Sequence, residues 1–237
     1  MAVQRIRVDP SVIRKIRNNQ EKITIMAFIN TKILSAPKML ASMALVIGAL
    51  ISFQSFAASS TAPEVMAAEK YLKNMDTVRA RFVQESNGLQ ATGTFYLDRP
   101  GKLRFEYDPP IQDYIVADGI FIYFYDSELG QQTNAPIGQT LADFLLRENI
   151  SLSGDVVVKG ISHTPENVNI TVVQKSDPLA GALTLTFNKE PYQLKKWTVV
   201  DATGAQTDVT LLDAETDVAL DSSLFVYRDQ KPKGLNQ

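Results

Sequence analysis

The chain has 237 residues, with 24 basic and 26 acidic side chains and a formal net charge of −2. Its hydrophobic fraction of 45% is enough for the core of one domain of ordinary size. It contains no cysteine, which excludes disulfides, thiolate catalysis, cysteine-ligated zinc, iron–sulfur clusters and the acylated N-terminal cysteine of a bacterial lipoprotein.

The first recognisable element is an uncharged apolar run over residues 39–53. Lys32 and Lys38 precede it, and a small-x-small tripeptide follows at residues 55–57. This order is typical of a secretory signal peptide. A transmembrane anchor is the alternative, but about 15 apolar residues fall short of the roughly 20 that span a bilayer. We therefore expect residues 1–57 to be an N-terminal extension and signal peptide.

Export implies cleavage after Ala57 and a single folded domain over residues 58–237. The long basic segment before the apolar run leaves three candidate start residues, Met1, Met26 and Met39. Removal of the N-terminal part leaves 16 basic and 24 acidic residues, a net charge of −8. A protein this acidic is not expected to bind nucleic acid or anionic lipid surfaces electrostatically.

The exported part begins with a predicted helix over residues 62–75. Thr61 is a candidate N-cap, Pro63 suits the first turn, and Glu64 lies where the helix dipole favours a negative charge. Apolar residues recur at helical spacing and predict one buried stripe: Val65, Ala68, Tyr71, Leu72 and Met75.

Almost everything after this helix predicts strands. They are expected at residues 78–84, 90–97, 102–107, 113–117, 120–126, 155–159, 167–175, 181–188, 193–200 and 206–213. Turn pairs such as Asn87-Gly88 and Asp118-Gly119 separate them. A short helix over residues 140–147, preceded by a flexible stretch over 130–138, interrupts the series. Strands at this spacing predict a large antiparallel sheet, a sandwich or a barrel.

Two of the predicted strands have unusual apolar character. In the strand over 102–107, charged residues alternate with an apolar row: Leu103, Phe105 and Tyr107. In the strand over 120–126 both faces are apolar or aromatic: Ile120, Ile122 and Phe124 on one face, and Phe121, Tyr123 and Tyr125 on the other. Either protein covers both faces of this strand or one face lines a ligand cavity. A register shift of one residue would exchange the two faces.

Little in the sequence indicates catalysis. The single histidine, His163, lies on a polar strand where a surface position is expected. We find no nucleophile elbow, phosphate loop, dinucleotide fingerprint or metalloprotease motif. Trp197 is expected in the core rather than on a sugar-binding surface. A hydrolase using two distant carboxylates is the enzymatic alternative. We expect a protein that is not an enzyme and has no cofactor or metal.

The order and spacing of several motifs resemble the LolA family of periplasmic carriers, which take lipoproteins from the inner to the outer membrane of Gram-negative bacteria. In chain order the motifs are Phe82-Val83-Gln84, Gly93-Thr94-Phe95, residues 99–107 with Pro109-Pro110, Val116-Ala117-Asp118-Gly119, Tyr123-Phe124-Tyr125-Asp126 and the segment 136–146. Together they cover nearly all of residues 62–230.

The resemblance implies a mainly β (α+β) fold: an unclosed antiparallel β-barrel, or strongly curved sheet, with helices covering a concave hydrophobic cavity. It also implies that Arg99 hydrogen-bonds to a helical lid and holds the empty cavity shut, with the lid at Leu141, Phe144 and Leu145. The residues expected to line an acyl-binding cavity are Phe95, Leu97, Leu103, Phe105, Tyr107, Ile122, Phe124, Leu141, Phe144 and Leu145.

The implied partners follow from the same resemblance. Acylated lipoproteins would be the cargo of a monomeric periplasmic carrier. An inner-membrane lipoprotein-releasing ABC transporter complex would be the donor, and an outer-membrane receptor lipoprotein the acceptor. Two alternatives stay open besides the hydrolase: a related half-barrel protein that senses lipoproteins or carries other lipids, and a structural envelope protein.

Overall fold

The computed structural model describes residues 62–127, 129–139 and 143–228. Its elements are, in chain order, α2 (Pro63–Lys73), β1 (Thr77–Ser86), β2 (Leu89–Asp98), β3 (Lys102–Tyr107), β4 (Tyr114–Asp118), β5 (Phe121–Asp126), β6 (Gln131–Pro136), η1 (Ile137–Gln139), α3 (Asp143–Leu146), β7 (Val156–His163), β8 (Asn167–Gln174), β9 (Gly181–Lys189), β10 (Tyr192–Asp201), β11 (Gln206–Thr216) and η2 (Ser222–Phe225).

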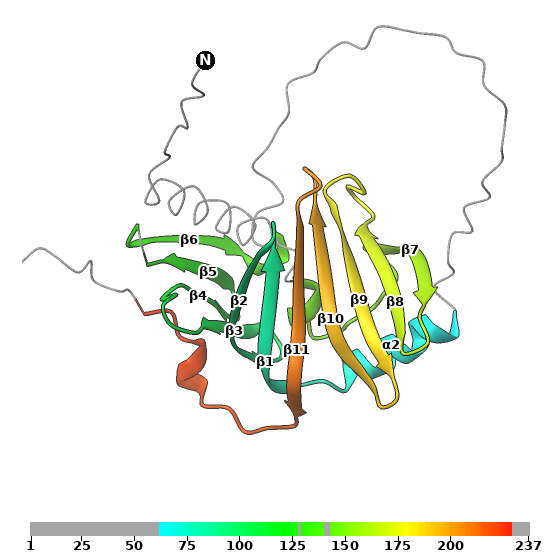
Figure 1. Cartoon of the computed structure of the whole chain (residues 1–237), viewed down its shortest axis with the longest axis horizontal. Helices are drawn as coiled ribbons and strands as arrows, with labels where there is room; N and C mark the ends of the chain where they lie inside the picture. Colours follow the sequence, from blue (N-terminus) through cyan, green and yellow to red (C-terminus); the bar gives the residue numbers. More distant parts are fainter. Residues whose placement is uncertain (1–61, 128, 140–142, 229–237) are drawn as a thin grey trace, which may run out of the picture.

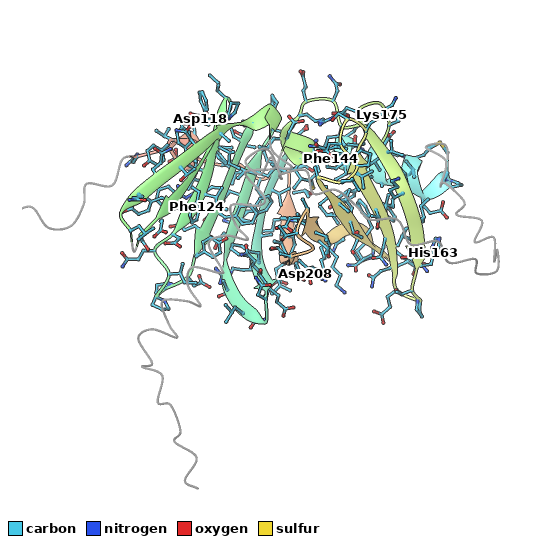
Figure 2. All side chains as sticks on the ribbon, turned by 90° about the horizontal axis from the view of Figure 1, so that it is seen from above. Asp118, Phe124, Phe144, His163, Lys175 and Asp208 are labelled. Carbon is cyan, nitrogen blue, oxygen red and sulfur yellow. The ribbon has the colours of Figure 1, made fainter. Side chains whose placement is uncertain are left out.

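Within these residues, eleven strands form one sheet in the order β6-β5-β4-β3-β2-β1-β11-β10-β9-β8-β7. Each pairing is antiparallel, and β6 and β7 form the two open edges. Register shifts in β1, β7 and β10 bend the strands, as β-bulges do. The sheet is strongly curved but not closed (Figures 1 and 2), which confirms the predicted fold class.

The helices lie over the concave face of this sheet. In Figure 1, α2 runs behind strands β8 to β10, and it buries Val65, Ala68 and Leu72, part of its predicted stripe. Helix α3 buries Phe144 and Leu145. Figure 2 shows Phe144 between the two halves of the curved sheet. The apolar side chains of both helices join those of the strands in one buried cluster.

The convex face of β3 to β5 is covered by the C-terminal segment. Asp221 caps η2 by accepting a hydrogen bond from the amide of Ser223, and Phe225 is buried. Tyr227 stacks on Tyr123 with ring centroids 4.6 Å apart. The hydroxyl of Tyr114 donates to a backbone oxygen of the same segment at 2.9 Å. Protein therefore packs against both faces of β5, although Phe121 at its start stays 37% exposed.

Two local predictions were wrong. The stretch 130–138, expected to be flexible, contains β6 and η1. Its polar residues form a strand because their backbone groups pair with β5 along its whole length. Ile120 does not share the buried row of Ile122, since it is 69% exposed. It lies in the turn before β5, where its amide donates to the Asp118 carboxylate at 2.9 Å.

In the described residues, the helix predicted over 140–147 is seen as α3 (Asp143–Leu146), which ends one residue before the predicted end. Thr140 and Leu141 lie outside the described residues, as do the predicted signal peptide and its cleavage position.

Candidate functional site

The concave face brings together most of the residues expected to line a cavity. Nine of the ten lie in the described part of the chain and belong to one buried apolar cluster: Phe95, Leu97, Leu103, Phe105, Tyr107, Ile122, Phe124, Phe144 and Leu145. The tenth, Leu141, lies outside the described residues. These nine residues come from β2, β3, β5 and α3, so predicted residues up to 50 positions apart in the sequence face the same interior.

Phe105 is at the centre of the aromatic part of this cluster. Its ring lies 5.2 Å from Phe82, 4.8 Å from Phe95 and 6.2 Å from Trp197, mostly in edge-to-face arrangements. The strand register explains the contact between Phe95 and Phe105, because the two residues are directly opposite each other in the β2–β3 pair. Trp197 is 1% exposed, as the core prediction requires. The middle of the concave face is therefore a continuous aromatic surface.

One polar pair interrupts the apolar surface. The hydroxyl of Tyr107 donates to Oε1 of Gln84 at 2.9 Å, and both side chains are buried. A buried hydroxyl needs such a partner to offset its desolvation.

Sequence analysis missed the half of the site that lies under α2. Tyr71 packs its ring edge-on against Phe187 at 5.8 Å, and Tyr192 stacks on Phe187 at 5.2 Å. The hydroxyl of Tyr192 has no hydrogen-bond partner among the described residues. Burial, with a further contribution from the Glu64 carboxylate, raises the pKa of Tyr192 to about 12. The sequence signals that could have predicted this half are the alternating apolar residues of β9 and β10 and the apolar stripe on α2.

Arg99 lies in the turn between β2 and β3 and caps the end of α2. Its Nε donates to the backbone oxygen of Met75 at 2.7 Å, and its Nη2 donates to the backbone oxygens of Met75 and Leu72. Asp76 is 3.9 Å from Nη2, and its own backbone oxygen accepts from the Arg99 amide at 2.9 Å. A cation at this position also complements the negative end of the helix dipole.

The Arg99 side chain is almost completely buried, with 3% exposed. Burial lowers the pKa of the guanidinium, and the nearby Asp76 carboxylate opposes that shift. The guanidinium remains charged at neutral pH because its ordinary pKa is far higher. Desolvating this charge is costly, so the carbonyls of α2 that receive its hydrogen bonds are essential to its position.

Among the described residues, the hydrogen bonds of the Arg99 side chain reach the end of α2, a helix that the sequence analysis did not name as a lid. Within the described residues, Arg99 bonds to α2 and not to Phe144 or Leu145 of α3. The same turn does reach α3, but through its backbone: the amide of Gly101 donates to the carbonyl of Leu146 at 2.8 Å. The β2–β3 turn therefore holds both helical covers, one by a side chain and one by the main chain.

Potential metal ligands and the single histidine were also located in the structure. No group of three or more potential metal ligands is present among the residues that the structure describes. His163 is exposed at the end of β7 and lies 3.5 Å from Glu64 of α2. In the same residues, no helix has both the length and the hydropathy needed to cross a bilayer.

A family model and curated relatives of this chain agree on one protein family. Residues 73–228 match the family model of the outer membrane lipoprotein carrier protein LolA. An outer-membrane lipoprotein carrier protein from Methylococcus capsulatus is 27% identical over 168 residues, 67% of this chain and 80% of the relative. One from Chromohalobacter salexigens is 29% identical over 142 residues, 58% of this chain and 67% of the relative.

Solved structures were compared as well. A LolA superfamily protein from Nitrosomonas europaea has a TM-score of 0.40 and 10% sequence identity, covering 68% of this chain and 96% of the other. A structure of MucB has a TM-score of 0.42 and 14% identity, covering 72% of this chain and 64% of the other.

Proposed function

Since this chain belongs to the LolA family of outer membrane lipoprotein carrier proteins, we propose that it binds the acyl chains of lipoproteins against the concave face of its sheet. The observation that carries the proposal is the aromatic and aliphatic cluster centred on Phe105, which two short helical covers close over. An acyl chain that enters between the covers and the sheet would replace contacts with side chains by contacts with methylene groups.

The energetics suit a carrier. Burial of one methylene is worth about 0.8 kcal/mol, so the acyl chains of a lipoprotein are strongly driven out of water. Cargo must also leave, and a cover that packs on the sheet in the empty protein competes with it. Apparent affinity falls in proportion to the fraction of protein in the open, binding-competent state.

Arg99 is proposed to set this competition. In the closed protein it makes three charge-assisted hydrogen bonds to the end of α2, each stronger than a neutral one. Moving α2 off the sheet breaks them. Arg99→Leu should therefore favour the open state, raise the affinity for acylated ligands and slow their release.

The wider cellular role is part of the proposal. We infer export to the periplasm with cleavage after Ala57, a folded domain over residues 58–237 that acts as a monomer, and no enzymatic activity. The proposed donor is the inner-membrane lipoprotein-releasing ABC transporter complex, and the proposed acceptor is the outer-membrane receptor lipoprotein. The family membership and the family names of its relatives support this assignment.

The test uses residues 58–237 and an apolar fluorescent probe that brightens on burial. Displacement of the probe by a triacylated lipopeptide, but not by the same peptide without acyl chains, is expected. Arg79→Leu is the matched control for Arg99→Leu, because Arg79 is an exposed arginine paired with Glu215 on the opposite face. Failure of any acylated ligand to displace the probe would refute the proposal. Equal release rates for parent and Arg99→Leu would refute the role of Arg99.

A further inference from the structure

Glu69 joins α2 to the segment that connects α3 to β7. Its Oε1 accepts a hydrogen bond from the backbone amide of Leu152 at 2.7 Å and another from the hydroxyl of Ser151 at 3.1 Å. Leu152 is completely buried, and it lies in the segment that follows α3 and leads to β7. A carboxylate on α2 thus satisfies a backbone donor in the segment that connects α3 to β7.

This contact is the third polar contact that holds the segments covering the concave face. The β2–β3 turn holds the end of α2 through Arg99 and the end of α3 through the amide of Gly101. Glu69 links α2 to the segment after α3. With only the first two ties, either cover could lift from the sheet alone. With the third, lifting α2 or moving the segment that follows α3 breaks a charge-assisted hydrogen bond between the two.

We propose that Glu69 is a positioning residue that makes the two covers open and close as one unit. The inference rests on the proposed function, because it concerns access to the same concave face. Glu69 touches no ligand in this proposal; it acts through Leu152 and Ser151. It adds an element that sequence analysis did not predict, since neither the helix nor the loop carries a motif for it.

The direction in which Glu69→Ala changes affinity follows from the fact that the hydrogen bond to Leu152 exists in the closed state. In Glu69→Ala the closed state keeps the Leu152 amide buried without an acceptor, which is costly, whereas the open state lets water satisfy it. Loss of Glu69 therefore weakens the closed state alone and increases the open fraction. A larger open fraction gives tighter apparent binding of any ligand that needs the open state.

Three variants separate this role from a merely structural one. Glu69→Ala removes the acceptor, and Glu69→Gln keeps an amide oxygen at the same place. Lys73→Ala is the matched control, because Lys73 lies 3.9 Å from Glu69 and its removal leaves the hydrogen bond to Leu152 intact. The readouts are affinity for the triacylated lipopeptide and melting temperature in its absence.

We expect Glu69→Ala to bind the lipopeptide about 5- to 30-fold more tightly than the parent while melting at a lower temperature. Glu69→Gln should recover part of the difference, and Lys73→Ala should behave like the parent. If Glu69→Ala melts lower and also binds more weakly, Glu69 only stabilises the fold and the inference is wrong.

Backbone amide exchange of the ligand-free protein tests the coupling without any ligand. In Glu69→Ala, exchange should rise together in α2, in α3 and in the segment that follows it, over residues 143–155, because an 11-residue helix is marginal once it leaves the sheet. Faster exchange confined to Leu152 would show a local contact and overturn the inference. This measurement remains decisive even if no variant binds an acylated ligand, so failure of the carrier proposal and failure of the coupling are distinguishable.

Discussion

The concave and convex faces of the sheet carry two different coverings. On the concave side, α2 and α3 lie on an apolar cluster, and the polar contacts that hold them involve Arg99, Gly101 and Glu69. On the convex side, the C-terminal segment is held across its width by stacked tyrosines and by the bond from Tyr114 to a backbone oxygen. Figure 2 places Phe144 and Asp208 on these opposite sides.

The difference shows how one sheet can be stable and still admit a ligand. Polar contacts on the convex face link neighbouring strands. Asp108 of the β3–β4 loop accepts hydrogen bonds from Arg81 of β1 and Thr92 of β2. Lys196 of β10 forms an ion pair with Asp208 of β11. In the proposed opening, these convex contacts stay in place, whereas the concave hydrogen bonds to the covers break. Substitutions on the concave face should therefore change both stability and ligand affinity, whereas substitutions on the convex face should change stability alone.

The largest effect is expected from Trp197→Ala on the concave side. Trp197 is fully buried against Phe95 and Phe105, and truncation of such a residue costs about 3–5 kcal/mol through lost burial and a residual cavity. Denaturant unfolding should show this loss. Lipopeptide binding should change too, since the aromatic surface itself is altered. Unchanged binding would mean that acyl chains do not reach this part of the face.

Gly93→Ala tests how tightly the same face is packed. A Cβ on Gly93 would lie 2.6 Å from Cε1 of Phe82 and would also overlap the backbone oxygen of Glu106. Overpacking of this kind costs about 1–3 kcal/mol. Thermal unfolding should report the loss. The matched control is Gly138→Ala, where the added Cβ meets nothing within 4 Å and little change is expected. Equal stability of the two variants would contradict the packing described for β1 and β2.

Sequence alone predicts the repeating part of this fold well. The strand over residues 102–107 agrees with β3, and Leu103, Phe105 and Tyr107 are buried as one row. Period-two alternation encodes both the strand and its face, because one side of the sheet is apolar. The stretch 131–136 has no such alternation. It becomes β6 only because β5 offers a full set of backbone partners.

Tertiary partners could not be predicted in the same way. Arg99 was identified as a lid-holding residue, but its acceptors are carbonyls 24 and 27 positions earlier in the chain. Backbone carbonyls carry no sequence signal, so nothing distinguished α2 from α3 as its partner. The C-terminal cover was missed for a related reason: Phe225 and Tyr227 are two isolated aromatics without a period, and their place depends on β4 and β5.

Tyr227→Ala is the convex counterpart of the concave variants. It removes the stacking on Tyr123 and the ring contact with Tyr114 at 6.2 Å. Aromatic pairs contribute about 0.5–1.5 kcal/mol beyond their buried area, so a loss of about 1–2 kcal/mol is expected. Affinity for the lipopeptide should stay at the parent value, because the concave ties are intact. A change in affinity would show that the two faces are not independent.

The smallest effect is a pH dependence that also differs between the faces. The hydrogen bond from Arg147 lowers the pKa of Asp155, at the end of the segment that carries α3. A carboxyl with a depressed pKa stabilises the fold above its unfolded value, near 3.9, and loses that contribution as pH falls through the folded value. The side chain is 61% exposed, so solvent screening limits the contribution to less than about 1 kcal/mol.

Asp155→Asn should therefore be slightly less stable than the parent at pH 7, and the gap should shrink toward pH 3, as thermal unfolding at both values can measure. Asp108→Asn gives the convex comparison, because a hydrogen bond from Arg81 lowers the pKa of Asp108 as well. The stability advantage of the parent over each variant should disappear in the same pH window, because only the parent carries the carboxyl that titrates there. Only Asp155→Asn should also raise lipopeptide affinity at pH 7, because only its ion pair belongs to a cover. An equal affinity change in both variants would contradict the division between a fixed convex face and a closable concave one.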